Sequence, residues 1–329
     1  MNSLLVGLAA FAATAFAEGR TSAPDGCLNV AKSGGDYKTI QSAVDSLSTS
    51  SSADQCIFIN PGTYSEQVLV SARAAQLTFY GYTDDTSSYS GNQVTITSSL
   101  SQDDGLSNDE TATLRIKAAD FKMYNINVEN AFGEGSQAVA LSAYADSGYY
   151  GCAFYGFQDT LLSNVGYQLY AKSLISGATD FIFGQKAAAW FEQSDIRVLG
   201  KSLGYITANG REESDGISFY VFSNCDVAAG EGESVPEGAY YLGRPWREYA
   251  QVVFQNTAMS AVINQDGWHI WNDGDERTDG VLFGEYNNSG DGAAGPRVDF
   301  ATMLNKAKSI SDILTSSYSS AGYYDASYL

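Results

Sequence analysis

Residues 135–184 read GSQAVALSAYADSGYYGCAFYGFQDTLLSNVGYQLYAKSLISGATDFIFG, and this stretch decides the fold. Glycines recur in it every 21 residues, at Gly135, Gly156 and Gly177. A step of this size lies within the range of solenoid repeats, in which each repeat forms one coil. Parallel strands of stacked coils lie roughly 4.8 Å apart, so equivalent positions become neighbours. The register therefore predicts a parallel β-helix.

Two polar columns follow the glycine column in the same register. The first holds Gln137, Gln158 and Thr179, and the second holds Ala138, Asp159 and Asp180. Two carboxylates this close cannot both ionise easily, so one pKa should rise and that group can act as a general acid. The other carboxylate can act as a nucleophile, and the two glutamine amides can hold an oxyanion. The columns thus predict a site for carboxylate chemistry.

Structural roles for the same residues stay open at this level. Aspartate suits a corner beside glycine, and stacked glutamines can stiffen a coil as a polar ladder. In addition, Gln158 and Asp159 are adjacent, and side chains of adjacent residues on a regular strand face opposite ways. They can share a site only if the chain turns or bulges between Gly156 and Thr160.

The rest of the chain fits one all-β domain over residues 18–329. Short apolar runs broken by Gly, Asn, Asp and Ser follow one another, and no long helix separates them. The leucine-rich pattern that shares this period is absent. Helical spacing predicts a short helix over 36–47, with Asp36 as its N-cap, and another over 300–314 that covers the end of the coil. Residues 230–238 and 287–295 read as surface loops.

The N-terminus and the charge balance indicate an exported protein. Residues 4–16 are apolar and small, and Ala15-Phe16-Ala17 before Glu18 is a cleavage pattern, so residues 1–17 read as a secretory signal peptide. No other apolar stretch approaches membrane-spanning length, so we expect no membrane insertion. With 18 Lys and Arg against 38 Asp and Glu, the net charge is −20, which argues against nucleic-acid binding. The same charge favours an acidic working medium, where repulsion from a polyanion is weaker.

The four cysteines suit an exported protein without a metal centre. We predict a disulfide between Cys27 and Cys56, since each adjoins a strand-like run, and expect Cys152 and Cys225 to be free and buried. No C-x-x-C occurs and His269 is the only histidine, so we expect no metal and no cofactor.

One familiar catalytic motif occurs but lacks its context. Residues 200–204 (GKSLG) fit the G-x-S-x-G nucleophile elbow, and His269 follows in the right order. The motif needs a strand, a turn and a helix, and the neighbouring sequence shows no such alternation. We expect His269, between Trp268 and Trp271, to be a packing residue.

Three longer stretches resemble the signatures of the pectin methylesterases: 156–161 (GFQDTL), 180–184 (DFIFG) and 242–246 (LGRPW). The resemblance continues through 37–44 (YKTIQSAV), 59–64 (INPGTY) and 206–211 (ITANGR), and it covers the mature chain. It implies a right-handed parallel β-helix with short capping helices. The acidity is similar to that of secreted fungal members.

The resemblance also implies a role for each site residue. Asp180 would attack the methyl ester carbonyl of a galacturonate, and Asp159 would protonate the methanol and then activate water. Gln158 and Gln137 would stabilise the oxyanion, and Arg244 would keep Asp180 ionised. Trp246 and Phe183 would contact the sugar and its ester. The implied partner is pectin, bound by a monomer that needs no cofactor.

Two other functions stay open on sequence grounds. Paired aspartates also serve glycoside cleavage, so a β-helical pectin glycosidase or lyase is the first alternative. A carbohydrate-binding solenoid without activity is the second. Residues 287–289 (Asn287-Asn288-Ser289) form an N-glycosylation sequon, which agrees with export.

Overall fold

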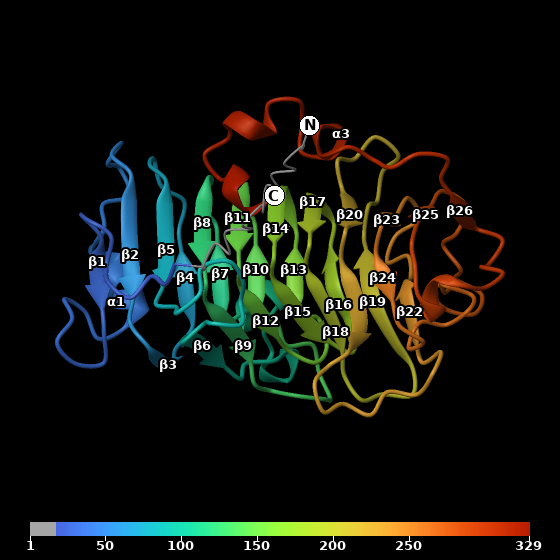
Figure 1. Cartoon of the computed structure of the whole chain (residues 1–329), viewed down its shortest axis with the longest axis horizontal. Helices are drawn as coiled ribbons and strands as arrows, with labels where there is room; N and C mark the ends of the chain where they lie inside the picture. The colour runs from blue at the N-terminus through green and yellow to red at the C-terminus, as the bar shows by residue number, and fades with distance from the viewer. Residues whose placement is uncertain (1–17) are drawn as a thin grey trace, which may run out of the picture.

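The computed structural model describes residues 18–329, and the signal peptide predicted over 1–17 lies outside this range. Three parallel sheets run side by side along an elongated coil, with the N-terminal coils at one end and the C-terminal coils at the other (Figure 1). Each coil contributes one strand to most of these sheets. The β-helix predicted from the 21-residue register is confirmed.

The three sheets contain 26 strands among the described residues. The eleven-stranded sheet consists, in spatial order, of β1 (Leu28–Val30), β2 (Gln55–Ile59), β5 (Leu77–Gly81), β8 (Phe121–Tyr124), β11 (Ser147–Tyr150), β14 (Val165–Ala171), β17 (Lys186–Glu192), β20 (Phe219–Ser223), β23 (Gln251–Gln255), β25 (Leu282–Tyr286) and β26 (Ala301–Met303). The eight-stranded sheet consists of β24 (Ala258–Met259), β21 (Asp226–Ala229), β18 (Asp195–Val198), β15 (Leu174–Gly177), β12 (Ala153–Tyr155), β9 (Asn127–Asn130), β6 (Val94–Ser98) and β3 (Gly62–Ser65). The seven-stranded sheet, which carries the candidate site, consists of β22 (Tyr240–Gly243), β19 (Gly204–Asn209), β16 (Thr179–Gly184), β13 (Leu161–Ser163), β10 (Leu141–Ala143), β7 (Leu114–Ile116) and β4 (Val68–Val70).

The 21-residue step holds only in the middle of the coil. Ser147 pairs with Gln168, and Leu174 pairs with Asp195, each 21 residues further on. From β17 to β20 the step becomes 31 residues, from Ala188 to Phe219, because this coil has longer irregular segments over 199–203 and 210–218. The sequence repeat is visible where the coils are shortest.

Stacked aromatic rings fill the inside of the coil. Neighbouring rings in one column lie 4.3 to 4.8 Å apart between centroids, in the order Tyr149, Tyr170, Phe191, Phe222 and Phe254. Each ring comes from the same position of successive strands of the eleven-stranded sheet. Offset stacking at this spacing is favourable and makes the register specific.

Left-handed corners separate the eleven-stranded sheet from the eight-stranded sheet. A residue with positive φ follows each strand of the eleven-stranded sheet from β8 to β25, namely Asn125, Gly151, Lys172, Gln193, Asn224, Asn256 and Asn287. The run over 121–128, which reads as one apolar segment, is therefore divided between β8 and β9 at Asn125 (φ 54°). Asn and Gly tolerate this conformation better than most residues.

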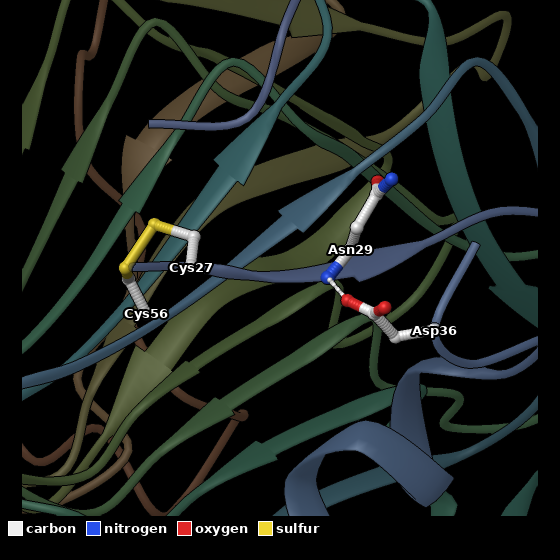
Figure 2. Close-up of a disulfide and its surroundings, with 4 residues drawn as sticks. All are labelled: Cys27, Asn29, Asp36 and Cys56. Carbon is white, nitrogen blue, oxygen red and sulfur yellow. Dashed lines mark hydrogen bonds between the residues drawn. A yellow bond between two sulfur atoms is a disulfide. The ribbon is translucent and has the colours of Figure 1, made fainter. Parts of the chain in front are cut away.

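The N-terminal end is closed as predicted, with one correction. Helix α1 (Ile40–Ser46) buries Ile40, Ala43 and Val44 against the first coils. Its N-cap is Thr39 and not Asp36, because the Asp36 carboxylate accepts a hydrogen bond from the Asn29 N–H at 2.8 Å (Figure 2). The helix therefore begins three residues later than an N-cap at Asp36 would place it.

The cysteine predictions are confirmed. Cys27 and Cys56 form a disulfide that joins β1 to β2 (Figure 2). Cys152 and Cys225 are free and buried, and each S–H donates to backbone carbonyls at a corner of the coil.

The helix predicted over 300–314 is wrong in extent and in position. Residues 301–303 extend the eleven-stranded sheet as β26, and only α3 (Ile310–Ile313) is helical. Ile313 packs with Trp190 and Val221 on the outer face of the same sheet, so α3 lies beside β17 and not over the open end (Figure 1). The short apolar patch on that face attracts the helix. The remaining short helices are α2 (Asn108–Thr111), η1 (Gln102–Asp104), η2 (Asp291–Ala293), η3 (Tyr318–Ser320) and η4 (Ala326–Tyr328).

Candidate active site

The two aspartates of the carboxylate column stand where the backbone turns. Asp159 has φ 65° and Asp180 has φ 50°, left-handed values that Asp tolerates better than most residues. The Asp159 N–H donates to the Thr179 carbonyl at 3.1 Å, and the pairing of β16 with β19 is irregular between Thr179 and Ile182. Because the chain turns here, Gln158 and Asp159 are not held on opposite faces of a regular strand. The condition that the sequence set for a shared site is fulfilled.

Arg244, which follows β22, forms a bidentate ion pair with Asp180 in β16, two strands away in the sheet. Its Nε donates to Asp180 Oδ1 at 2.9 Å and its Nη2 donates to Oδ2 at 2.7 Å. The guanidinium carbon lies 4.1 Å from the centroid of the Tyr205 ring and 4.3 Å from that of the Trp271 ring. A bidentate pair fixes the carboxylate in direction as well as in charge. Tyr205 and Trp271 in turn fix the guanidinium between their faces.

The two carboxyl groups differ in their electrostatic surroundings. Both aspartates are buried, with 7 % of each residue exposed. Burial raises the pKa of Asp159 well above the ordinary value, and the negative charge of Asp180 raises it further, against a smaller opposing effect of Arg244. Burial also raises the pKa of Asp180, but the hydrogen bonds and charge of Arg244 oppose this rise. The pair is therefore arranged to hold one proton on Asp159 and a charge on Asp180.

The two glutamines of the amide column lie on adjacent coils beside the aspartates. The Ala138 N–H donates to the Gln158 carbonyl at 3.1 Å, which sets Gln137 next to Gln158 in the stack. Both side chains are partly exposed. Neither side-chain amide donates a hydrogen bond to any other residue within 18–329. Their N–H groups are free to donate to a ligand.

An apolar strip on the outer face of the seven-stranded sheet adjoins the aspartates. Leu162, Phe183 and Ala208 are paired across β13, β16 and β19 and pack together. Trp246 covers Phe183 with 6.0 Å between ring centroids. Phe183 is only 2 % exposed, so it supports Trp246 and offers little surface of its own, whereas Trp246 is partly exposed.

Two aromatic residues of the site were not predicted. Tyr205 comes from β19, and Trp271 comes from the irregular segment 268–277. Packing was predicted for His269 alone, and its neighbour Trp268 is fully buried and stacked on Phe283. Trp271 can be assigned to the site only because it contacts Arg244, and this contact is known only from the folded structure.

The serine of the G-x-S-x-G motif does not stand in the context that a nucleophile elbow needs. Ser202 lies in an exposed turn that leads into a strand, so the helix that a nucleophile elbow needs is missing. His269 packs against Tyr205 and Tyr241. Within 18–329 no group of three or more His, Cys, Asp or Glu side chains is placed to hold a metal ion. No helix in the same range is long and apolar enough to cross a membrane.

Comparison with known proteins gives consistent results. The family model described as pectinesterase matches residues 28–320. A pectinesterase of Aspergillus aculeatus is 52 % identical over 324 residues, with 97 % of each chain covered. The crystal structure of the pectin methylesterase from Aspergillus niger, in deglycosylated form, is 44 % identical with a TM-score of 0.88, over 94 % of this chain and 100 % of that one. Pectin methylesterase from carrot is 28 % identical with a TM-score of 0.79, over 92 % and 98 %.

These likenesses and the geometry define the class of protein first. The chain is a carboxylic ester hydrolase built on a right-handed parallel β-helix. More specifically, it belongs to the pectinesterase family and resembles the fungal members most closely among the relatives named here.

Proposed function

We propose that this chain hydrolyses the methyl esters of galacturonate in pectin, with Asp180 as the nucleophile and Asp159 as the acid and base. The observation that carries the assignment is the pair of hydrogen bonds from Arg244 to Asp180, beside a buried Asp159 whose carboxyl group has no hydrogen-bond or ion-pair partner within 18–329. A charged carboxylate and a protonated one on adjacent coils are the two reagents that ester cleavage needs.

The first half of the reaction transfers the acyl group to the enzyme. The Asp180 carboxylate attacks the ester carbonyl carbon, and the carbonyl oxygen becomes an oxyanion. When the tetrahedral intermediate collapses, the bond to the methoxy oxygen breaks and Asp159 gives that oxygen its proton. Methanol leaves, the galacturonyl group remains bound to Asp180 as an anhydride, and Asp159 is left ionised.

The second half restores both carboxyl groups. Asp159 now accepts a proton from water, and the resulting hydroxide equivalent attacks the galacturonyl carbon. Collapse of this intermediate releases the galacturonic acid, which then loses its proton to solvent, and frees the Asp180 carboxylate, again held by Arg244. The side-chain amides of Gln137 and Gln158 donate to the oxyanion in both halves, since they have no other partner in the described structure.

The apolar strip supplies the binding surface for the methylated sugar. We assign Trp246 to direct contact with the sugar ring and its ester, and Phe183 to the support of Trp246. All reagents are side chains, so the proposal requires no cofactor and no metal.

The remaining parts of the proposal concern where the enzyme acts. Residues 1–17 serve as a signal peptide, and residues 18–329 form the single catalytic domain of a secreted monomer. The net charge of −20 and the absence of a basic patch in the sequence favour pectin in an acidic medium over nucleic acid or membranes as the partner.

The decisive experiment compares methanol and reducing ends released from highly methylated pectin at pH about 5, a pH suggested by the charge balance. We expect methanol without new reducing ends from the wild type, and loss of most methanol release in Asp180→Asn and Asp159→Asn. Reducing ends without methanol would favour a glycosidase, unsaturated products a lyase, and binding without product a carbohydrate-binding protein. Near-normal methanol release from Asp180→Asn would refute the nucleophile assignment.

A further inference from the structure

The column that contains the two glutamines also contains a hydroxyl group that the proposed mechanism does not use. Thr179 follows Gln158 at the 21-residue step, and a parallel β-bridge pairs the two residues in register. On its other side Thr179 pairs with Tyr205 of β19. Paired residues of neighbouring parallel strands lie roughly 4.8 Å apart, and their side chains face the same way. The Thr179 side chain therefore lies between those of Gln158 and Tyr205.

The hydroxyl of Thr179 is unusual because it is buried without a partner. Its Oγ1 is shielded from solvent and forms no hydrogen bond within 18–329. Buried polar groups are normally hydrogen-bonded, and one that is not calls for an explanation in structure or in function. Thr179 directly precedes Asp180 in β16, so the unpaired hydroxyl belongs to the strand that carries the proposed nucleophile.

The side-chain amide of Gln158 also lacks partners. Within 18–329 neither its N–H groups nor its Oε1 takes part in a hydrogen bond, and the residue is partly exposed. An amide presents a donor at one end and an acceptor at the other. It stabilises an oxyanion only when Nε2 points at the developing charge, because Oε1 in that place would repel it. A donor that holds Oε1 on the opposite side would fix the useful orientation.

The neighbours of Gln158 leave one candidate for that donor. The Gln137 amide, on the preceding coil, is assigned to the oxyanion itself. The Arg244 guanidinium is engaged by both oxygens of Asp180. The Thr179 hydroxyl, on the following coil, has a free proton and lies one strand spacing from Gln158.

We propose that Thr179 is a positioning residue that orients the Gln158 amide during the reaction. Its hydroxyl donates to Gln158 Oε1, so that Nε2 is directed at the oxyanion. No hydrogen bond joins the two side chains in this structure, and rotation of the long Gln158 side chain about its own torsions forms one. The inference rests on the proposed function, because it gives a partner to an oxyanion donor of that reaction.

The first test measures kcat and KM for methanol release from highly methylated pectin. Thr179→Val keeps the branched shape without the hydroxyl, and kcat should fall about 3- to 10-fold, the equivalent of one hydrogen bond, at unchanged KM. Thr179→Ser retains a hydroxyl and should retain the wild-type kcat. Thr63→Val is the matched control, since Thr63 is exposed in β3 of the eight-stranded sheet. It should leave kcat unchanged.

Thermal unfolding distinguishes positioning from a structural role. Thr179→Val removes a buried hydroxyl that has no partner, so its Tm should equal or exceed that of the wild type even though kcat falls. A parallel loss of Tm and kcat would show that the hydroxyl supports the fold, and would overturn the proposal.

A double variant tests whether Thr179 acts through Gln158. Gln158→Ala alone should lower kcat about 100-fold or more, the usual cost of an oxyanion donor. Adding Thr179→Val to Gln158→Ala should then cost nothing further, because the amide that it orients is gone. A full additional loss in the double variant, or a wild-type kcat in Thr179→Val alone, would overturn the positioning role. Absence of methanol from the wild type would instead overturn the proposed function.

Discussion

At the scale of single residues, the environment of Asp180 depends on one guanidinium. Arg244 opposes the rise in pKa that burial imposes on Asp180, so its charge keeps the nucleophile ionised at lower pH. In Arg244→Lys the planar fork is lost, and an ammonium cannot donate to both carboxylate oxygens in the same way. The pKa of Asp180 should rise, and the acid limb of the kcat/KM profile should move to higher pH. An acid limb at the wild-type position, together with reduced kcat, would indicate that Arg244 only orients Asp180.

The second residue-scale prediction concerns the cost of the buried acid. Burial and the charge of Asp180 raise the pKa of Asp159 above its value near 4 in the unfolded chain. A raised pKa in the folded state stabilises the protein fully at pH values below the unfolded pKa, and this stability is lost as the pH rises through the folded pKa. Asp159→Asn cannot ionise and should therefore be inactive but more stable than the wild type at pH 7.

The measurement for this prediction is thermal unfolding of both proteins between pH 3 and pH 7. The difference in Tm should shrink as the pH falls from 7 to 3, because Asp159 is protonated in both states of the wild type below the unfolded pKa. A Tm difference that is constant with pH would show that the gain comes from packing of the amide and not from the lost charge.

The sequence predicted the site at this scale to the extent that backbone register determines it. The proximity of Asp159 and Asp180 could be predicted because they are separated by the 21 residues that stack one coil on the next. The aromatic rings that flank Arg244, those of Tyr205 and Trp271, could not be predicted in this way. Tyr205 is separated from Trp271 by a long and irregular stretch of chain, and their meeting depends on loop geometry that has no period.

At the scale of elements, the corners of the coil are fixed by a ladder of small polar side chains. At five of the seven left-handed corners the next residue is buried, and its hydroxyl or thiol donates to the carbonyl two residues earlier: Cys152, Ser173, Ser194, Cys225 and Thr257. The Ser173 hydroxyl also accepts from the Cys152 N–H at 3.1 Å. One side chain thus satisfies backbone groups of two coils.

The ladder predicts a clear loss of stability for one conservative substitution and almost no change for another. Ser173→Ala leaves the buried Cys152 N–H without a partner and should lower the free energy of unfolding by about 1 to 3 kcal/mol. Cys225→Ser places in the ladder the residue that already stands at position 194, and should change it by less than about 1 kcal/mol. Urea unfolding measures both, with Ser202→Ala in an exposed turn as the control. Equal losses in Ser173→Ala and the control would show that the ladder adds no stability.

Strand positions were predictable from apolar runs, whereas corners were not. The run over 121–128 is apolar enough to read as one strand, and only the left-handed conformation of Asn125 divides it. In the same way, Asp36 had the right residue type for an N-cap, but its carboxylate binds the Asn29 N–H. Local propensity identifies which side chains can cap or turn, and tertiary contacts decide which of them do so.

At the scale of the whole molecule, the two ends of the coil are closed by different means. Helix α1 and the Cys27–Cys56 disulfide close the first coils, and both were predictable because they involve segments close in sequence. At the far end β26 is the last strand of the eleven-stranded sheet, and Phe300 packs against Phe283 of β25. The C-terminal segment, expected there, instead runs back over the eleven-stranded sheet, where Ile313 and Tyr323 find an apolar patch (Figure 1). That patch is assembled from many coils and leaves no local signal in the sequence.

Because each coil contacts mainly its neighbours, damage at one end should remain separate from the active site. The disulfide closes a loop with a sequence separation of 29 residues, for which the chain-entropy argument gives about 3 to 4 kcal/mol. In the sheet order, β2 is separated from β17 by β5, β8, β11 and β14. The double variant Cys27→Ser/Cys56→Ser should therefore lose thermal stability in the first coils while kcat/KM for methanol release at 25 °C stays at the wild-type value. Thermal unfolding and activity measured on the same samples, with Cys225→Ser as the control, test this separation. A parallel loss of activity at 25 °C would mean that closure of the first coil is transmitted along the sheet to Asp180.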